Sequence, residues 1–144
     1  MIPPEGRWTV PADLAALALL QEGAGDWLRQ AGVDEAAAAR VLLALDELAA
    51  NIVHHAGLGA DARFEVALER EAGELRVRIS DAGRPFDPTA ATSPPPAATL
   101  DEVSVGGFGL GLVRRLARSM DYRREDGRNH LRLRFAAGPA RAAD

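Results

Sequence analysis

The sequence contains no cysteine and no lysine, and these two absences exclude several kinds of chemistry. Without cysteine the chain has no disulfide framework, no zinc–thiolate site and no thiol nucleophile. All 17 residues of the Lys and Arg class are arginines, so the lysine that a phosphate-binding P-loop requires is missing. Any cationic contact with a ligand must therefore come from arginine or histidine.

The chain also lacks a long apolar run and a strong excess of one charge. No stretch approaches the roughly 18 apolar residues of a membrane span, and the N-terminus lacks the apolar segment of a signal peptide. The net charge of −4 argues against nonspecific nucleic-acid binding as the main role. A length of 144 residues predicts one domain over 1–144. Together, these observations predict a cytoplasmic protein with no membrane contact and no direct nucleic-acid contact.

Two stretches have the apolar spacing of amphipathic helices. The first predicts a helix over 14–30 with Asp13 near its N-cap, and its inward stripe comprises Leu14, Leu17, Leu20, Ala24, Trp27 and Ala31. The second predicts a helix over 35–56, with Val41, Leu45, Leu48 and Ile52 inward. A third helix is predicted over 110–120, with Leu112, Leu116 and Met120 inward.

Alternating apolar residues predict strands between these helices. A short strand over 7–11 comes first, and strands over 63–70 and 74–80 form a hairpin. A final hairpin turns at Asp126-Gly127, with Leu131, Leu133 and Phe135 on one face. This order predicts an α+β two-layer sandwich, in which about three helices cover one face of a mixed, mostly antiparallel sheet.

Residues 87–105 are rich in proline, alanine and threonine and have no apolar periodicity. A segment of this length inside a small domain is typical of a lid or a binding loop. A linker between two domains is the alternative interpretation. We favour the lid, because neither half of the chain has enough predicted elements for a comfortable domain of its own.

The segment "GGFGLGL", residues 106–112, places four glycines before the third predicted helix. Free backbone N–H groups at a helix N-terminus can bind an anion. The P-loop pattern is absent, and the dinucleotide pattern G-x-G-x-x-G fails because Leu112 stands at its third glycine. By itself the segment leaves a phosphate site and a flexible helix entry equally open.

Two polar clusters change this interpretation. Glu47 and Asn51 are four residues apart on the second predicted helix, where an amide oxygen can bind Mg²⁺ and a carboxylate can deprotonate a hydroxyl. Asp81 ends a predicted strand, and Gly83 lets a ligand approach the backbone, so the carboxylate can accept a hydrogen bond from an exocyclic amine such as that of adenine. A solvated helix face and an ordinary Asp-Gly turn are the respective alternatives.

Together, three segments carry a family resemblance. "ELAANIVHHA", "DAGRPFD" and "GGFGLGL" resemble, in this order, the N, G1 and G2 boxes of the GHKL ATPase/kinase superfamily. The resemblance covers about residues 8–136. Within the superfamily the compact chain is similar to the bacterial anti-sigma-factor serine/threonine kinases, whose G1 box has the form DxGxPFDP.

The resemblance implies a role for each box. Asn51 is expected to coordinate Mg²⁺, and Glu47 is expected to act as the catalytic base for a serine or threonine hydroxyl. Asp81 is expected to contact the adenine amino group, with Gly83 giving room beside it, and 87–105 to form the lid. The segment expected to wrap the ATP phosphates comprises Gly107, Phe108, Gly109, Leu110 and Gly111.

The implied function is an ATP- and Mg²⁺-dependent serine/threonine protein kinase that acts as an anti-sigma regulator. It would phosphorylate a STAS-type anti-anti-sigma protein and sequester a sigma factor, and the family tendency predicts a homodimer. A non-catalytic ATP-sensing module and a detached histidine-kinase catalytic domain remain as alternatives. Arg114 and Arg115 are left open between phosphate contact, a protein partner and solvent.

Overall fold

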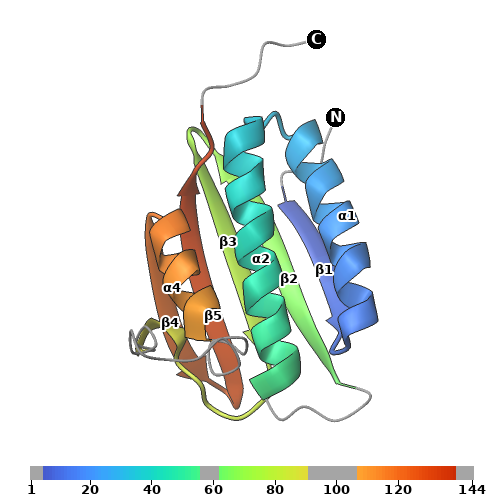
Figure 1. The fold of residues 1–144 in the computed structure, drawn as a ribbon, viewed down its shortest axis with the longest axis vertical. Coiled ribbons are helices and arrows are strands. Elements are labelled where there is room, and N and C mark those ends of the chain that lie inside the picture. Colours follow the sequence, from blue (N-terminus) through green and yellow to red (C-terminus); the bar gives the residue numbers. More distant parts are fainter. Residues whose placement is uncertain (1–4, 56–61, 91–106, 139–144) are drawn as a thin grey trace.

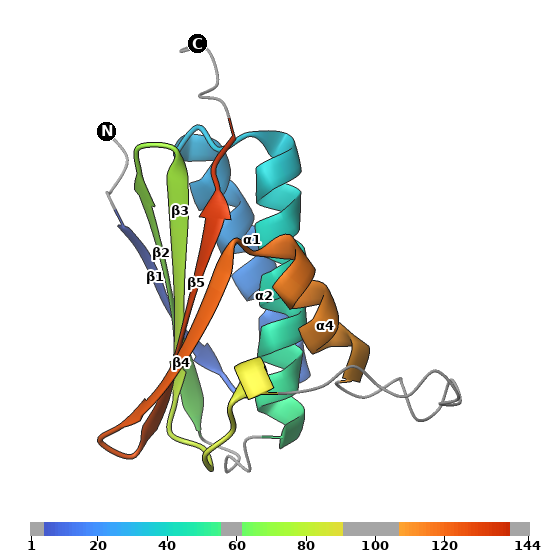
Figure 2. The ribbon, with the colours of Figure 1, turned by 90° about the vertical axis from the view of Figure 1, so that its left-hand side faces the viewer.

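A computed structural model describes residues 5–55, 62–90 and 107–138 of the chain. These residues form two layers, an antiparallel sheet and three helices that lie together on one face of it (Figure 1 and Figure 2). The α+β sandwich predicted from the sequence is confirmed. Most of the predicted lid over 87–105 lies outside the described residues, and so does Gly106.

The sheet has five strands in the order β1-β2-β3-β5-β4, and every described pairing is antiparallel. The strands are β1 (Glu5–Pro11), β2 (Arg63–Glu71), β3 (Glu74–Asp81), β4 (Ser119–Glu125) and β5 (Arg128–Ala136). The helices are α1 (Leu14–Gln30), α2 (Glu35–His55) and α4 (Gly107–Leu116), and a short 3-10 turn, η1, spans Pro88–Ala90.

Helix α1 begins where the sequence predicts. The Asp13 side chain accepts a hydrogen bond from the backbone N–H of Ala16 at 2.8 Å, as an N-cap residue does. Leu14, at the first position of the predicted inward stripe, is instead 56% exposed, so its predicted inward position is wrong. Gly23 has a packing reason, since a Cβ there would lie 2.7 Å from Nε1 of Trp8.

The central strands have a regular inner face. In the register of β3 with β5, Leu75 lies opposite Phe135, and the next two inner rows are equally apolar. All of these inner side chains are buried against α2 and the other helices, together with Phe64, Val66 and Leu68 of β2. The turn between β4 and β5 is the predicted one, with φ of 53° at Asp126 and 73° at Gly127, as a type I′ hairpin requires.

Helix α4 differs from the helix predicted over 110–120. It starts within the glycines at Gly107 and ends at Leu116, because burial of Leu110 and Val113 against the core outweighs the low helix propensity of glycine. Val113 is fully buried, whereas Leu112 is only half-buried and its predicted inward position is wrong. Met120 packs partly against the core, but it does so from strand β4.

The outer face of the sheet is polar and carries most of the described ion pairs. Arg78 bonds Glu5 across the sheet, and Arg76 bonds Glu74 at 3.2 Å. The hydrogen bond that Arg76 donates to the Glu74 carboxylate, and next the negative charge of Glu71, raise the pKa of Arg76 above its usual value. Because polar and apolar residues alternate along the strands, this face of the sheet is exposed to solvent and the opposite face forms the core.

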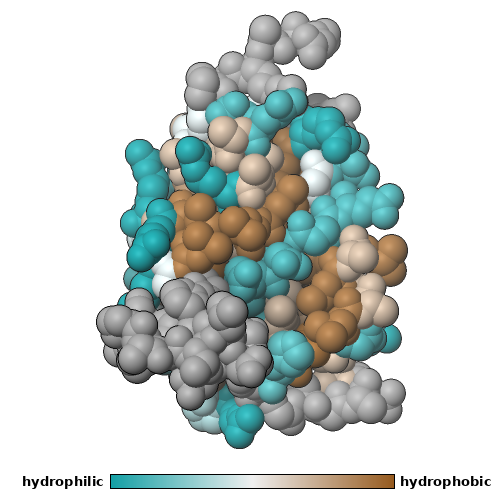
Figure 3. Space-filling view, in the orientation of Figure 1, coloured by the Kyte–Doolittle hydropathy of each residue, from teal (hydrophilic) through white to brown (hydrophobic). Residues whose placement is uncertain are grey.

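The helical side shows where apolar surface reaches the solvent. Apolar side chains gather over α1, where Leu14 and Leu19 are exposed, and between α2 and α4 (Figure 3). Within the described part of the chain, no helix combines the length and the apolar composition that a membrane crossing requires.

Candidate functional site

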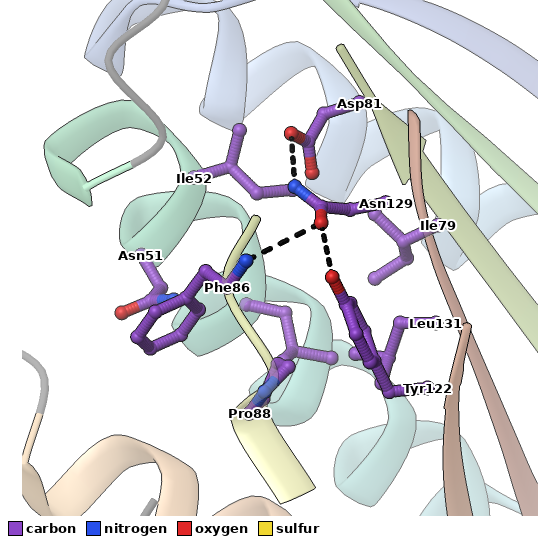
Figure 4. Close-up of a pocket in the computed structure, with 10 residues that line it drawn as sticks. Asn51, Ile52, Ile79, Asp81, Phe86, Pro88, Tyr122, Asn129 and Leu131 are labelled. Carbon is purple, nitrogen blue, oxygen red and sulfur yellow. Dashed lines mark hydrogen bonds between the residues drawn. The ribbon is translucent and has the colours of Figure 1, made fainter. Parts of the chain in front are cut away.

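A pocket lies at the end of the sheet where β3 finishes and β5 begins, beneath the C-terminal half of α2 (Figure 4). About 430 Å³ of empty space lies within it, part of which is open to solvent. Its described lining comprises Leu48, Asn51, Ile52, Ile79, Asp81, Phe86, Pro88, Tyr122, Asn129 and Leu131. A mostly apolar wall with a few polar groups is what small-molecule sites commonly have.

The buried polar residues of the described chain identify this pocket. Asn51, Asp81 and Asn129 are the three polar or charged residues that the described chain buries, and all three line it. Buried polar side chains are unusual in a core unless they are hydrogen-bonded or serve a ligand. They come from α2, β3 and β5, so the fold brings together residues that are far apart in the sequence.

Asp81 is held in one orientation by its neighbours. As the last residue of β3 it is inward-facing and only 6% exposed. Its Oδ1 accepts hydrogen bonds from the backbone N–H of Gly83 at 2.8 Å and from Nδ2 of Asn129 at 3.0 Å. No described residue bonds Oδ2. The carboxylate therefore has one oxygen held by the protein and one available to accept a hydrogen bond from a ligand.

Asn51 and Glu47 lie on α2 as predicted, but they are placed differently relative to the pocket. Asn51 is 8% exposed and lines the pocket, and no described residue bonds its side chain. Glu47 is half-buried one helical turn earlier, and it is not among the described residues that line the pocket. The pocket thus brings Asn51 and Asp81 together, and Glu47 lies on the adjacent turn of the same helix.

The side-chain oxygen atoms of the pocket suit a hard cation that is coordinated mainly by a bound nucleotide and by water. Among the described residues there is no group of three or more His, Cys, Asp or Glu side chains that could hold a metal ion. The amide oxygen of Asn51 is a hard ligand of the kind that Mg²⁺ accepts, with the remaining positions filled by water and phosphate oxygens. The residues present therefore fit a magnesium ion that arrives with a nucleotide, and they do not form a metal cage of their own.

The glycine-rich segment forms the start of α4. Of the five residues predicted to wrap phosphates, none is among the described residues that line the pocket. Gly107, Phe108 and Gly109 make the first turn of α4. The side chain of Leu110 is buried in the core at 4% exposure, so only its backbone is available to a ligand. Gly111 follows, half-buried, in the second turn of the helix.

Arg114 and Arg115 separate in the structure. Nη2 of Arg114 lies 3.4 Å from the carbonyl oxygen of Pro88, to which it donates, and Pro88 is part of the pocket wall. Asp87 caps the same turn by accepting from the backbone N–H of Thr89 at 2.8 Å. Arg115 is exposed on α4. Arg114 therefore fastens α4 to the segment that enters the predicted lid.

Sequence reasoning missed Asn129 and Tyr122, which line the pocket, and Arg124, which bonds Asn129. Oδ1 of Asn129 accepts from the Tyr122 hydroxyl at 2.5 Å and from Nη1 of Arg124 at 3.2 Å. The signal for Asn129 was present, because extending the alternation of Phe135, Leu133 and Leu131 by one step reaches a polar residue at an inward position. Tyr122 and Arg124 gave no comparable signal, since their partners became known only with the strand register.

Comparison with known proteins identifies the family. The model of the family described as "Histidine kinase-like ATPase domain" matches residues 10–135. The chain belongs to this family. It is 37% identical over 118 residues to the serine/threonine-protein kinase BtrW of Bordetella bronchiseptica, a match that covers 78% of this chain and 83% of that protein. The predicted GHKL membership and the predicted enzyme class, a serine/threonine-protein kinase, are confirmed.

Solved structures share the fold at lower identity. The RsbU and RsbW domains of Rv1364c from Mycobacterium tuberculosis match with a TM-score of 0.67 and 20% identity, covering 99% of this chain and 35% of that one. This chain thus spans about a third of that longer protein. The SiaB-SiaC complex from Pseudomonas aeruginosa matches with a TM-score of 0.59 and 19% identity, covering 90% of this chain and 88% of that chain.

Proposed function

We propose that this protein is an ATP-dependent anti-sigma kinase, which phosphorylates a serine or threonine of a STAS-type anti-anti-sigma protein and sequesters a sigma factor in the cytoplasm. The observation that carries the proposal is the set of three buried polar residues, Asn51, Asp81 and Asn129, which line one pocket. The relationship to BtrW supports the kinase chemistry.

Recognition of the adenine base would use the free oxygen of Asp81. Oδ2 accepts a hydrogen bond from the 6-amino group, and the apolar wall formed by Ile52, Ile79 and Leu131 covers the ring. Gly83, whose backbone N–H bonds Asp81, has no side chain and would leave room beside the base. An amine donor facing a carboxylate acceptor distinguishes adenine from a 6-oxo purine.

Phosphoryl transfer would take place between α2 and the start of α4. The Asn51 amide oxygen would hold Mg²⁺, which when bound neutralises charge on the phosphates. The first backbone N–H groups of α4, over 107–111, have no partner earlier in the helix and would bind the phosphates. Glu47, one turn from Asn51, would accept the proton of the attacking hydroxyl. With no lysine in the chain, arginine is the side chain proposed to bring positive charge to the phosphates.

The proposed partners follow from the same relationship. The structure of a SiaB-SiaC complex shows that a protein of this fold binds a second protein. By analogy this chain would bind its protein substrate across the open end of the pocket, with residues 87–105 closing over ATP as a lid. A homodimer is the assembly proposed here. No nucleic acid and no membrane take part in this scheme.

The proposal is tested by phosphate transfer. The purified protein is incubated with Mg²⁺ and γ-labelled ATP together with candidate STAS-type proteins from the source genome, and acid-stable label on a serine or threonine is expected. Glu47→Gln should lower transfer by roughly a hundredfold or more while ATP binding is retained, as loss of a general base does. Asp46→Asn removes an exposed carboxylate from the adjacent position of α2, and it should leave transfer unchanged.

Three outcomes would contradict the proposal. A preparation that binds ATP but transfers no phosphate would leave an ATP-sensing binding module. Acid-labile label on the target would indicate a histidine-kinase catalytic domain. Absence of ATP binding in calorimetry, with and without Mg²⁺, would remove the nucleotide site altogether.

A further inference from the structure

Asn129 is the one buried polar residue of the pocket to which the proposed function gives no role. It lies opposite Asp81 in the register of β3 with β5, and it is 6% exposed. Figure 4 shows its side chain between Asp81 on one side and Tyr122 on the other. An amide at this depth in the core needs a full set of hydrogen-bond partners, so the partners indicate what it does.

The hydrogen bonds of Asn129 use its whole capacity. Nδ2 donates to Oδ1 of Asp81 at 3.0 Å and to the carbonyl oxygen of Arg84 at 2.8 Å. Oδ1 accepts from Tyr122, from Arg124 and from the backbone N–H of Phe86 at 3.3 Å. An amide has two N–H donors, and here both are used, so Asn129 has no donor left for a ligand.

The same network determines which way round the amide lies. Both partners of Nδ2 are acceptors, and all three partners of Oδ1 are donors. Exchanging the nitrogen and the oxygen would place donors against donors and acceptors against acceptors. The N–H that faces Asp81 is therefore set by Tyr122, Arg124 and the turn after β3.

We propose that Asn129 is a positioning residue for adenine recognition: by holding Oδ1 of Asp81, it directs Oδ2 at the 6-amino group of the base. This inference rests on the proposed nucleotide site. Gly83 supplies the other bond to Oδ1, but it belongs to the turn itself, whereas Asn129 anchors the carboxylate to β5. Without Asn129 the carboxylate plane of Asp81 can turn about the last side-chain torsion, so that neither oxygen is held in the direction of the base.

A purely structural role makes a different prediction. If Asn129 only ties the turn at Arg84 and Phe86 to β5, its removal weakens the binding of every nucleotide that fills the pocket. If it positions Asp81, its removal weakens only those nucleotides that carry the 6-amino group. The two roles are separated by a nucleotide that keeps the purine ring and lacks the amine.

The experiment measures the affinities of ATP and of purine riboside 5′-triphosphate, the 6-deamino analogue, by calorimetry with Mg²⁺ present. Wild type should prefer ATP. Asn129→Ala should lower the ATP affinity about tenfold and the analogue affinity less than about twofold, as expected for one hydrogen bond to a charged group. Tyr122→Phe removes one donor to Oδ1 and keeps the ring, so it should give the same selective pattern with a loss of about two- to threefold.

The matched control is His130→Ala, the next residue of β5, whose side chain belongs to the outer face of the sheet. It should change neither affinity. Retained binding of the analogue shows that a variant is folded, and if Asn129→Ala does not fold, Tyr122→Phe provides the test. Equal losses for both nucleotides would overturn the positioning role and leave the nucleotide site intact. If wild type binds neither nucleotide, the proposed function fails, and this inference fails with it.

Discussion

The two ends of the central strands β3 and β5 share one sheet face and serve different purposes. At one end the inner rows are apolar, with Leu75 opposite Phe135 and Val77 opposite Leu133. At the other end the last row pairs Asp81 with Asn129. Backbone pairing and pleat continue unchanged from one end to the other, so the difference lies in the side chains alone. A stable fold and a polar pocket can therefore be built on the same two strands.

Burial at the two ends contributes differently to the free energy of folding. At the apolar end, each buried side chain stabilises the fold by about 1.5–3 kcal/mol relative to the same side chain exposed to water. A buried carboxylate costs free energy unless hydrogen bonds compensate it, and here Gly83 and Asn129 compensate one oxygen of Asp81. The other oxygen is left for a ligand. We therefore expect changes at the apolar end to affect folding and changes at the polar end to affect binding.

The largest effect on folding is expected from Phe135→Ala. This side chain is 2% exposed in the core, and its removal should lower the free energy of unfolding by about 3–5 kcal/mol, because it leaves a cavity. Urea denaturation measures the change. Arg134→Ala, one residue earlier on the outer face, is the control and should stay within about 0.5 kcal/mol. A loss below about 1 kcal/mol for Phe135→Ala would contradict the apolar role of this end.

Asp81→Asn should weaken ATP binding and leave the stability of the fold nearly unchanged, which is the reverse of what we expect for Phe135→Ala. The Asn carbonyl can take the place of Oδ1, so that an N–H points into the pocket where Oδ2 stood. ATP affinity should fall on the order of a hundredfold, about 2.7 kcal/mol, while the free energy of unfolding changes by less than about 1 kcal/mol.

Inosine triphosphate provides the check on this second prediction. Its 6-oxo group can accept a hydrogen bond from the new N–H, so the variant should bind it relatively better than wild type does. Calorimetry with both nucleotides compares them. If the free energy of unfolding falls by several kcal/mol while the nucleotide preference is unchanged, Asp81 serves the stability of the fold and not nucleotide recognition.

Two glycines of α1 test how closely the apolar layer is packed. A Cβ at Gly23 would lie 2.7 Å from Nε1 of Trp8, whereas a Cβ at Gly25 would lie 3.7 Å from Cδ1 of Leu42. Gly23→Ala should destabilise the fold by about 1–3 kcal/mol through overpacking. Gly25→Ala should stabilise it by about 0.5–1 kcal/mol through helix propensity. Thermal unfolding gives both signs, and equal signs would show that the indole of Trp8 moves aside freely.

The smallest effect is expected on the outer face. Arg134 lies directly opposite Arg76 in the sheet, and like charges in that position repel. Arg134→Gln should raise the free energy of unfolding by a few tenths of a kcal/mol, up to about 0.5. The gain should vanish in 1 M salt, where the Debye length is about 3 Å. A gain that persists at high salt would show that charge repulsion is not its cause.

Much of the fold could be predicted, because the local signals were strong. Asp13 caps α1, the Asp126-Gly127 turn closes the last hairpin, and Val41 and Leu45 face the core as their spacing indicates. Helix α4 was predicted less well. Its glycines suggested a loop, and Leu112 was placed inward because its spacing to Leu116 is helical. The packing of Val113 against the core decided the actual rotation of the helix.

The sequence by itself determined the helices, the hairpins, the family and the two polar residues Asn51 and Asp81, because each of these depends on residues close together in the chain. Only the tertiary structure decided that Asn129 meets Asp81, with Tyr122 and Arg124 behind it. Their association depends on the pairing of β3 with β5, which joins residues 48 positions apart. Strand register is set by the burial of a whole sheet face, and no local pattern specifies it.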